Sequence, residues 1–202
     1  MFNVYKRYGL FIAMLSLCSL MASCQFIEEA AGVLGSGPEP NTVIYTIPKG
    51  AHSSLNSRFK QVKTTKLRFE VTFDKSAIYT CEKAENQADI NKLYGLSDCG
   101  THHHVNSARF GWRWLNNRLE LLAYAYVDGV RKYEYITSID LEKPVVCELT
   151  LEDNQYRFRV GEKVTILPRA CSGSLDAYQL YPYFGGDEVA PHDIQIKIKD
   201  LL

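Results

Sequence analysis

The stretch PVVCELTLEDNQYRFRVGEKVTILP, residues 144–168, contains three short runs in which apolar and polar side chains alternate. Val145, Cys147, Leu149 and Leu151 form the apolar face of the first run, and two similar runs follow after turn residues. A period of two is typical of a strand with one buried face, and short turns join such strands into an antiparallel meander. The stretch therefore predicts three consecutive antiparallel strands.

The same alternation continues through most of the chain after residue 42. KLRFEVTFD (66–74) and DIQIKIKDL (193–201) each place their large apolar side chains on one face. RLELLAYAYVDGVRKYEYITSI (118–139) predicts a hairpin whose tip is the Asp-Gly pair 128–129, because both residue types tolerate positive φ. Only KAENQADINKLYG (83–95) indicates a short helix. About nine short strands without alternating helices indicate an all-β sandwich or barrel, and we predict an antiparallel β-sandwich.

The first residues have the composition of an export signal. Lys6 and Arg7 precede the apolar run GLFIAMLSLCSLMAS (9–23), which is short for a transmembrane helix and ends in small residues. The sequence LMASC (20–24) resembles the lipobox of bacterial lipoproteins. Met21 departs from that pattern, in which leucine is usual, so an ordinary secretory cleavage stays an alternative.

The lipobox resemblance implies a membrane-anchored lipoprotein. It implies a signal peptide at 1–23 and lipidation of Cys24 with palmitate-type acyl chains. Residues 24–41 are rich in small residues, Gly and Pro, which suits a tether, and residues 42–202 are predicted to form one β-sandwich domain. The chain carries 23 basic and 23 acidic side chains, and this balance argues against a nucleic-acid partner.

Four cysteines follow Cys24 in a chain expected to be exported to an oxidising compartment. Cys147 alternates with apolar residues and is predicted to be a buried strand residue. Cys99 and Cys171 lie in loop-like stretches where a bridge is easier to close, so we predict a disulfide between them. Four unpaired small side chains are the alternative. No two cysteines have the spacing of a structural zinc site, and we predict neither a metal nor a cofactor.

Two resemblances go beyond these patterns. The meander and the ending LYPYFGGDEVAPHDIQIKIKDL (180–201) resemble the corresponding parts of concanavalin-like jelly rolls, which implies that type of sandwich. Residues 42–202 also resemble a group of Bacteroidetes-type envelope lipoproteins, through YTIPKGAHSS (45–54), DINKLYGLSDC (89–99), NSARFGWRW (106–114) and YPYFGGDEVAPHDI (181–194). This second resemblance implies a location in the cell envelope, at the outer membrane, and no particular activity.

The segment THHHVNSARFGWRW (101–114) concentrates residues that bind metals, anions and sugars. A solvated loop is the interpretation we favour for its three histidines, and a metal site is the alternative. Neighbouring side chains of an extended chain point to opposite faces, so only His102 and His104 would share one. A polysaccharide lyase is another alternative, with arginine neutralising a carboxylate and His103 and tyrosine moving protons. A hydrolase would need paired carboxylates, for which only Glu148 and Glu152 have suitable spacing.

Alternation separates the aromatic side chains of NSARFGWRW from its arginines. If Phe110, Trp112 and Trp114 enter the core, their polar neighbours share the opposite face with polar residues of the next strand. Sugars present apolar ring faces edged by hydroxyls, which suits aromatic rings flanked by charged groups. We therefore predict a ligand site on that face, and its members are Arg109, Arg113, Glu120, Tyr124 and Tyr126. A structural network of the same residues is the alternative.

The sequence thus predicts a lipid-anchored envelope protein that binds a glycan or another surface component without catalysis. An enzyme of the lyase type and a purely structural envelope protein are the alternatives. A histidine within proton-transfer reach of a tyrosine in a cleft would favour the enzyme, and a shallow groove of arginine and aromatic residues would favour the binding protein.

Overall fold

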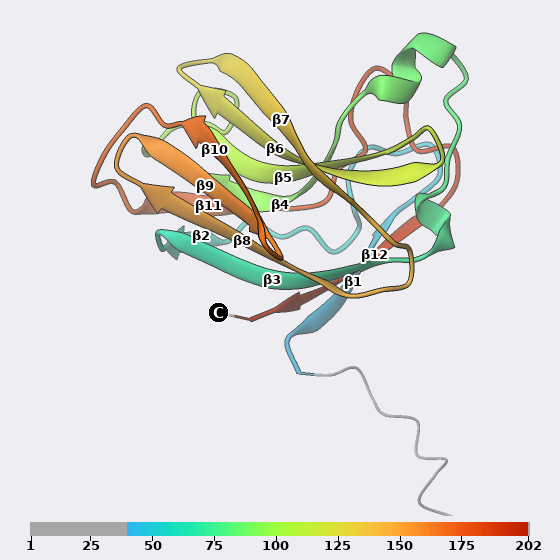
Figure 1. The fold of residues 1–202 in the computed structure, drawn as a ribbon, viewed down its shortest axis with the longest axis horizontal. Helices are drawn as coiled ribbons and strands as arrows, with labels where there is room; N and C mark the ends of the chain where they lie inside the picture. Colours follow the sequence, from blue (N-terminus) through green and yellow to red (C-terminus); the bar gives the residue numbers. More distant parts are fainter. Residues whose placement is uncertain (1–39, 202) are drawn as a thin grey trace, which may run out of the picture. The chain divides into compact units, whose positions relative to one another are not determined.

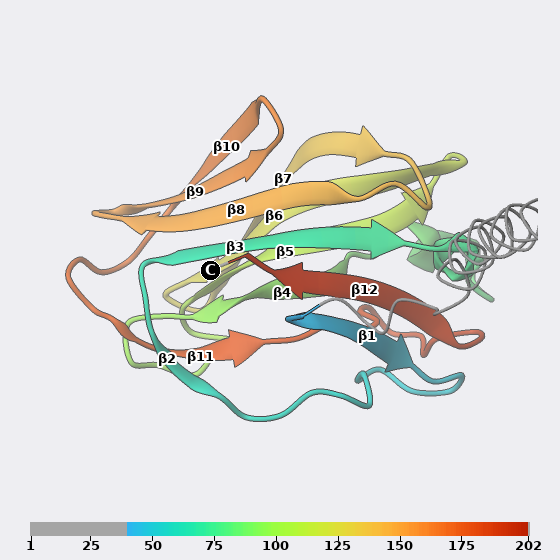
Figure 2. The same ribbon diagram turned by 90° about the horizontal axis from the view of Figure 1, so that it is seen from below.

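The computed structural model describes residues 40–201. The predicted signal peptide, the lipidated Cys24 and all but the last two residues of the predicted tether lie outside these residues. Twelve strands, rather than the nine predicted, form two antiparallel sheets of six strands each. Figure 1 and Figure 2 show the two sheets as stacked layers. The prediction of an all-β antiparallel sandwich is therefore confirmed.

The first sheet, sheet A, has the strand order β1-β12-β3-β8-β9-β10. In that order its strands are Thr42–Ile47, Ile194–Asp200, Lys66–Phe73, Val145–Glu152, Gln155–Val160 and Lys163–Pro168. The last three are the predicted meander, and Cys147 lies fully buried in it. The part of the sequence with the most regular alternation therefore forms three neighbouring strands of sheet A.

The second sheet, sheet B, has the strand order β2-β11-β4-β5-β6-β7. In that order its strands are Gln61–Lys63, Asp176–Leu180, Asn91–Ser97, Ser107–Leu115, Arg118–Val127 and Val130–Ile139. The turn between β6 and β7 contains Asp128 and Gly129, both at positive φ as predicted. Sheet B bears the residues that the sequence singled out for a ligand.

The predicted helix at 83–95 is wrong. Its first part forms only a short 3₁₀ helix, η2 (Ala84–Ala88), after a similar turn, η1 (Lys75–Ala77). Its second part is strand β4, in which every residue except the half-buried Lys92 is buried, so both faces of the strand are covered. Burial on both faces removes the alternation by which a strand is recognised. Among residues 40–201 no helix is long and apolar enough to cross a membrane.

The core lies between the sheets and is rich in aromatic rings. Phe110 of β5 packs edge-on against Phe69 and Phe158 of sheet A, with ring centres 5.6 and 5.2 Å apart. Trp112 packs against Phe73 at 5.1 Å and is fully buried. Edge-to-face contacts of this kind add to the free energy gained from apolar burial. The inner face of β5 is therefore fixed, and its outer side chains are held in defined positions.

A buried polar cluster joins two loops at one end of the sandwich. Cys99 and Cys171 form a disulfide across a sequence separation of 72 residues, while Cys81 and Cys147 are free thiols. Asp98, beside the disulfide, accepts hydrogen bonds from Arg169 and from the hydroxyl of Tyr156. These contacts hold the segment before β11 against the loop that leads from β4 to β5.

Candidate functional site

The register of β5 and β6 puts all five predicted ligand residues on the outer face of sheet B. Arg109 lies opposite Tyr124, and Arg113 lies opposite Glu120. Tyr126 lies opposite Ser107 on the same face. The five residues nevertheless divide into two groups, because the strands are long enough to separate Arg113 and Glu120 from the rest.

Arg113 and Glu120 form a structural ion pair. Arg113 Nε donates to Glu120 Oε2 at 2.8 Å, and Nη1 donates to the carbonyl of Ala88 at 2.8 Å. The side chains are only 18% and 7% exposed. The two opposite charges are therefore paired with each other inside the protein, and neither residue lines the basic cavity described below.

The other three predicted residues line a cavity of about 290 Å³. This cavity, which we call the basic cavity, is lined by Lys92, His103, His104, Arg109, Tyr124, Tyr126, Tyr183 and Gly186. The sequence did not predict a role for Lys92, Tyr183 or Gly186. Lys92 was hidden in the segment predicted as a helix, and Tyr183 and Gly186 belong to a non-repetitive loop whose path no periodicity reveals.

Arg109 is the most unusual residue of the basic cavity. Its side chain is buried, its Nε has no hydrogen-bond partner, and none of the salt bridges among residues 40–201 involves it. Its Cζ lies 6.0 Å from the centre of the Tyr124 ring. Burial lowers the pKa of Arg109 to about 10, although the neighbouring tyrosines act in the opposite direction. A buried cation without a carboxylate partner is costly, and an anion in the cavity would remove that cost.

The backbone beside Arg109 is shaped to admit its side chain. A β-bulge interrupts the pairing of β4 with β5 between Lys92 and Gly95. A Cβ on Gly95 would lie 2.2 Å from the Cβ of Arg109 and 2.2 Å from the carbonyl oxygen of Ala108. Only glycine therefore fits at this point of the sheet.

Lys92 brings a second cation to the same tyrosine. Its Nζ lies 5.2 Å from the centre of the Tyr124 ring and donates to the carbonyl of Ile90 at 2.7 Å. Burial, followed by repulsion from Arg109 and Arg131, lowers the pKa of Lys92 to about 8; Asp89 opposes this as the smallest of the causes. The basic cavity thus holds two cations that repel each other and attract an anion.

The three histidines form a compact cluster, contrary to what an extended chain would produce. A turn brings them together, with hydrogen bonds from the amides of Val105 and Asn106 to the carbonyl of His102. Their ring centres lie between 4.2 and 5.2 Å apart. One nitrogen of each ring lies within 4.8 Å of the others, so the cluster could hold a transition metal through imidazole ligands.

Two of the histidines face the basic cavity as neutral imidazoles. Burial, reinforced by Arg109 and the adjacent histidines, lowers the pKa of His103 to about 4 and also lowers the pKa of His104. Both His103 Nδ1 and its backbone amide lie 2.9 Å from the hydroxyl of Tyr178. The ring of His104 lies 5.3 Å from that of Tyr126. Neutral histidines next to tyrosine hydroxyls are groups that can move protons.

The carboxylate pair considered for hydrolysis lies elsewhere. Glu148 and Glu152 are on β8 of sheet A, whereas the basic cavity is on sheet B. Glu148 pairs with Lys66 at 3.0 Å, and Glu152 pairs with Arg157 at 2.9 Å. These two carboxylates are parts of ion pairs on sheet A and do not line the basic cavity.

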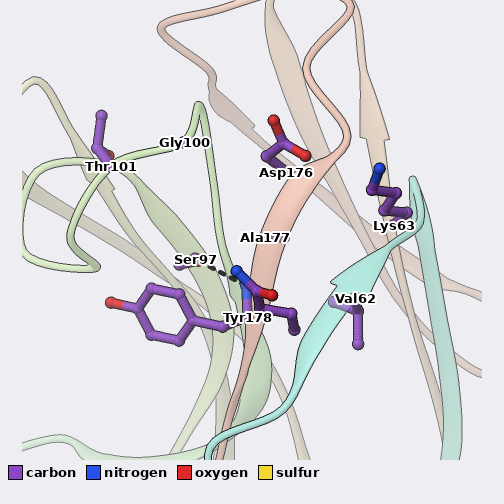
Figure 3. A pocket seen from close by; sticks show the side chains of 9 residues that line it. Val62, Lys63, Ser97, Gly100, Thr101, Asp176, Ala177 and Tyr178 are labelled. Atoms are coloured by element: carbon purple, nitrogen blue, oxygen red, sulfur yellow. Dashed lines mark hydrogen bonds between the residues drawn. The ribbon is translucent and has the colours of Figure 1, made fainter.

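A second and larger cavity, of about 530 Å³, opens beside the basic cavity on the same sheet. We call it the edge cavity, and Gln61, Val62, Lys63, Ser97, Gly100, Thr101, Asp176, Ala177 and Tyr178 line it. Figure 3 shows the Tyr178 ring extending away from Lys63 toward the segment that carries Thr101. Because Tyr178 also touches His103, it stands between the two cavities.

Comparison with known proteins supports the fold and nothing more specific. No protein-family model and no curated protein sequence matches the chain. The structure of the alginate lyase AlyC3 has a TM-score of 0.50 and 12% identity over 78% of this chain and 72% of its own. SCLam, a non-specific endo-β-1,3(4)-glucanase from family GH16, has a TM-score of 0.50 and 7% identity over 78% and 68%. These similarities place the sandwich among the concanavalin-like jelly rolls, as the sequence predicted.

Proposed function

We propose that the protein binds an acidic polysaccharide in the basic cavity. The observation that carries this proposal is the buried side chain of Arg109, whose Nε has no hydrogen-bond partner and which forms no salt bridge within residues 40–201, beside a second cation, Lys92. Arginine presents a rigid fork of donors that matches a carboxylate or a sulfate. An anionic group on the ligand would give Arg109 the hydrogen-bond acceptors and the negative charge that residues 40–201 do not give it.

Three features favour a sugar as the carrier of that anionic group. Tyr124, Tyr126 and Tyr183 surround the cations, and tyrosine combines an apolar ring with a hydroxyl that can pair with sugar hydroxyls. The cavity, of about 290 Å³, is small, which suits one sugar unit of a longer chain. The fold is shared with structures named as an alginate lyase and a glucanase, so polysaccharides are the class to test first.

The test is a binding titration with matched oligosaccharides. Uronic-acid oligosaccharides are compared with the same oligosaccharides after reduction of their carboxylates to neutral alcohols, and with sulfated oligosaccharides of equal length. We expect binding of at least one acidic series, no binding of the reduced series, and a loss of about tenfold or more in Arg109→Gln, because a charged hydrogen bond contributes about 1.5–3 kcal/mol. Equal binding of acidic and reduced oligosaccharides would overturn the proposal.

A second candidate function is β-elimination, favoured by the neutral His104 beside Tyr126 in the same cavity. Arg109 would pair with the uronate carboxylate and so acidify the proton at C5 of the sugar. His104 would take that proton while the bond from C4 to the glycosidic oxygen breaks. Tyr126 would donate its hydroxyl proton to the departing oxygen, and a C4–C5 double bond would remain in the product.

Binding and elimination are distinguished by the products. Incubation of the protein with the acidic polysaccharide that it binds is followed by ultraviolet absorbance of the unsaturated uronate and by product length. The binding function predicts no new absorbance and no shortening of the chain. The elimination function predicts both, with their loss in His104→Ala and in Tyr126→Phe while affinity is retained.

We also propose, from the lipobox resemblance, that the protein is anchored in the cell envelope through Cys24. The test expresses the full chain and its Cys24→Ser variant in a bacterial host that lipidates exported proteins. The wild type is expected in the membrane fraction with incorporated labelled palmitate. The variant is expected to lose the label, and a labelled variant would exclude Cys24 as the site.

A further inference from the structure

Residues of sheet B line both the basic cavity and the edge cavity, and Tyr178 of the edge cavity lies within hydrogen-bond distance of His103 of the basic cavity. Gln61 pairs with Tyr178, and Lys63 pairs with Asp176, so these four side chains lie on the same face of β2 and β11. Ala177, between them, points to the core and is buried. The strands that bear the two cavities are consecutive neighbours in the order β2-β11-β4-β5-β6.

Tyr178 is held firmly at the boundary. Its hydroxyl accepts a hydrogen bond from the amide of His103 at 2.9 Å, and its own amide donates to Ser97 Oγ at 2.8 Å (Figure 3). Ser97 is itself almost fully buried. The Tyr178 side chain is held at its hydroxyl and at its backbone amide. It therefore loses little conformational entropy when a ligand packs on its ring.

Phe59 extends this aromatic surface toward solvent. Its ring centre lies 5.5 Å from that of Tyr178, yet the residue is 76% exposed. The amide of Gln179 donates to the carbonyl of Lys60, which ties the segment carrying Phe59 to β11. Because the Phe59 ring is mostly exposed, it gains little free energy from apolar burial within the protein. Its position against Tyr178 suits it to pack on the apolar face of a sugar ring.

The two cavities differ in charge. Arg109 and Lys92 make the basic cavity cationic, whereas Lys63 and Asp176 give the edge cavity one charge of each sign. Gln61, Ser97 and Thr101 add amide and hydroxyl groups to the edge cavity, and these pair with sugar hydroxyls. The edge cavity is therefore suited to a sugar unit held through its hydroxyls and its ring face.

We infer that the two cavities are neighbouring subsites for one polysaccharide chain that crosses β6, β5, β4, β11 and β2, with Tyr178 and Phe59 under the sugar between them. This inference rests on the proposed function, because it assigns the anionic unit to the basic cavity. At about 4.8 Å between neighbouring strands, the path from β6 to β2 spans about 19 Å, which is longer than one sugar ring. The ligand is then a polymer bound along its length.

The experiment measures affinity as a function of chain length, with di-, tetra- and hexasaccharides of the uronic acid that binds, on the full-length protein. Affinity is expected to rise with length in the wild type. Phe59→Ala and Lys63→Ala are expected to weaken hexasaccharide binding about fivefold each and to leave disaccharide binding unchanged. Both side chains are exposed, so the melting temperature should not change.

Matched controls remove surface groups of the same kind away from the edge cavity. Leu55→Ala deletes a 70% exposed apolar side chain of the same segment, and Lys163→Ala deletes an exposed lysine of β10 on sheet A. Neither should change affinity at any length. A hexasaccharide that binds no better than a disaccharide, or that is unaffected by Phe59→Ala and Lys63→Ala, would overturn the extended site alone, because disaccharide binding dependent on Arg109 would persist. Failure of acidic oligosaccharides of every length to bind would overturn the proposed function and this inference together.

Discussion

Arg169 donates two hydrogen bonds to Asp98, from Nε to Oδ2 at 2.6 Å and from Nη2 to Oδ1 at 3.0 Å, with both side chains only 2% exposed. The pair lies beside the disulfide of Cys99 and Cys171 and joins the loop after β4 to the segment before β11. Both cavities depend on these segments, since the first leads to His103 and the second to Tyr178. The ion pair thus holds together the two segments from which residues of both cavities come.

Asp98→Asn should destabilise the protein strongly. The substitution leaves the Arg169 guanidinium buried without a counter-charge, which costs about 3–5 kcal/mol for a pair of this burial. Urea unfolding monitored by tryptophan fluorescence measures the loss. Asp140→Asn is the control, because the pair of Asp140 with Lys143 is exposed and its removal should leave the unfolding midpoint unchanged. Equal midpoints for wild type and Asp98→Asn would contradict the structural role.

Gly95→Ala should displace Arg109 and weaken binding of acidic glycans. The new methyl group would lie 2.2 Å from the Cβ of Arg109 and 2.2 Å from a backbone carbonyl, so the two strands must separate. We expect affinity for the uronic oligosaccharide to fall at least tenfold, together with a loss of stability of about 2 kcal/mol from overpacking. The titration used for Arg109→Gln measures the first effect, and denaturant unfolding measures the second.

Gly111→Ala separates overpacking from displacement of Arg109. A methyl group there would meet the Ile90 side chain at 2.5 Å, away from the carbonyl and Cβ that Gly95 adjoins. This variant should lose stability and keep its affinity. If both variants lose affinity equally, general distortion of sheet B explains the effect, and the positioning of Arg109 by Gly95 does not.

Arg113→Ala should lower stability and leave glycan affinity unchanged. The alternation of β5 predicted Arg113 as a ligand residue, but the structure shows it bound to Glu120, whose side chain is only 7% exposed. Loss of the arginine leaves that carboxylate with Arg118 alone, at 3.9 Å, and we expect a cost of about 2 kcal/mol. The double variant with Glu120→Ala should recover part of this cost. Loss of affinity at unchanged stability would restore Arg113 to the ligand site.

The sequence predicted the outer face of β5 and β6 because the charged residues and tyrosines within these strands fall on one face. That alternation identified Arg109, Tyr124 and Tyr126, which line the basic cavity. It could not separate them from Arg113, because the position of a residue along a strand does not show whether its charge forms an ion pair within the protein. It predicted the disulfide pair from the loop positions of Cys99 and Cys171, and the structure contains that bridge.

The parts that could not be predicted depend on contacts between distant segments. Lys92 lies in a strand that is buried on both faces, so apolar and polar residues do not alternate there and the local pattern does not indicate a strand. The sequence indicated a loop at the three histidines, but it did not show that hydrogen bonds to the carbonyl of His102 would bring their rings together. The edge cavity needs the pairing of β2 with β11, which are more than 100 residues apart in the chain.

Binding of acidic glycans should weaken as the pH rises through about 8. The pKa of Lys92 is lowered to about 8 by burial and by Arg109 and Arg131, so its ammonium loses its proton in this range while Arg109, with a pKa of about 10, stays charged. A protonated Lys92 attracts the ligand anion, and its deprotonation removes that attraction. His103 and His104, whose pKa values are lowered, are already neutral there, and the uronate carboxylate is ionised throughout.

The affinity is therefore expected to be constant between about pH 6 and pH 7 and to fall about tenfold by pH 9.5. A tenfold loss corresponds to the free energy of about one charged hydrogen bond, the one expected from Lys92 to the ligand. Calorimetric titration across this range should also show proton uptake on binding near pH 8, because a bound anion raises the pKa of Lys92. Lys92→Met should bind weakly with a flat profile. A Lys92→Met variant that still loses affinity between pH 7 and pH 9.5 would assign the titration to another group of the cavity, and an unchanged wild-type affinity would show that the ligand anion does not reach Lys92.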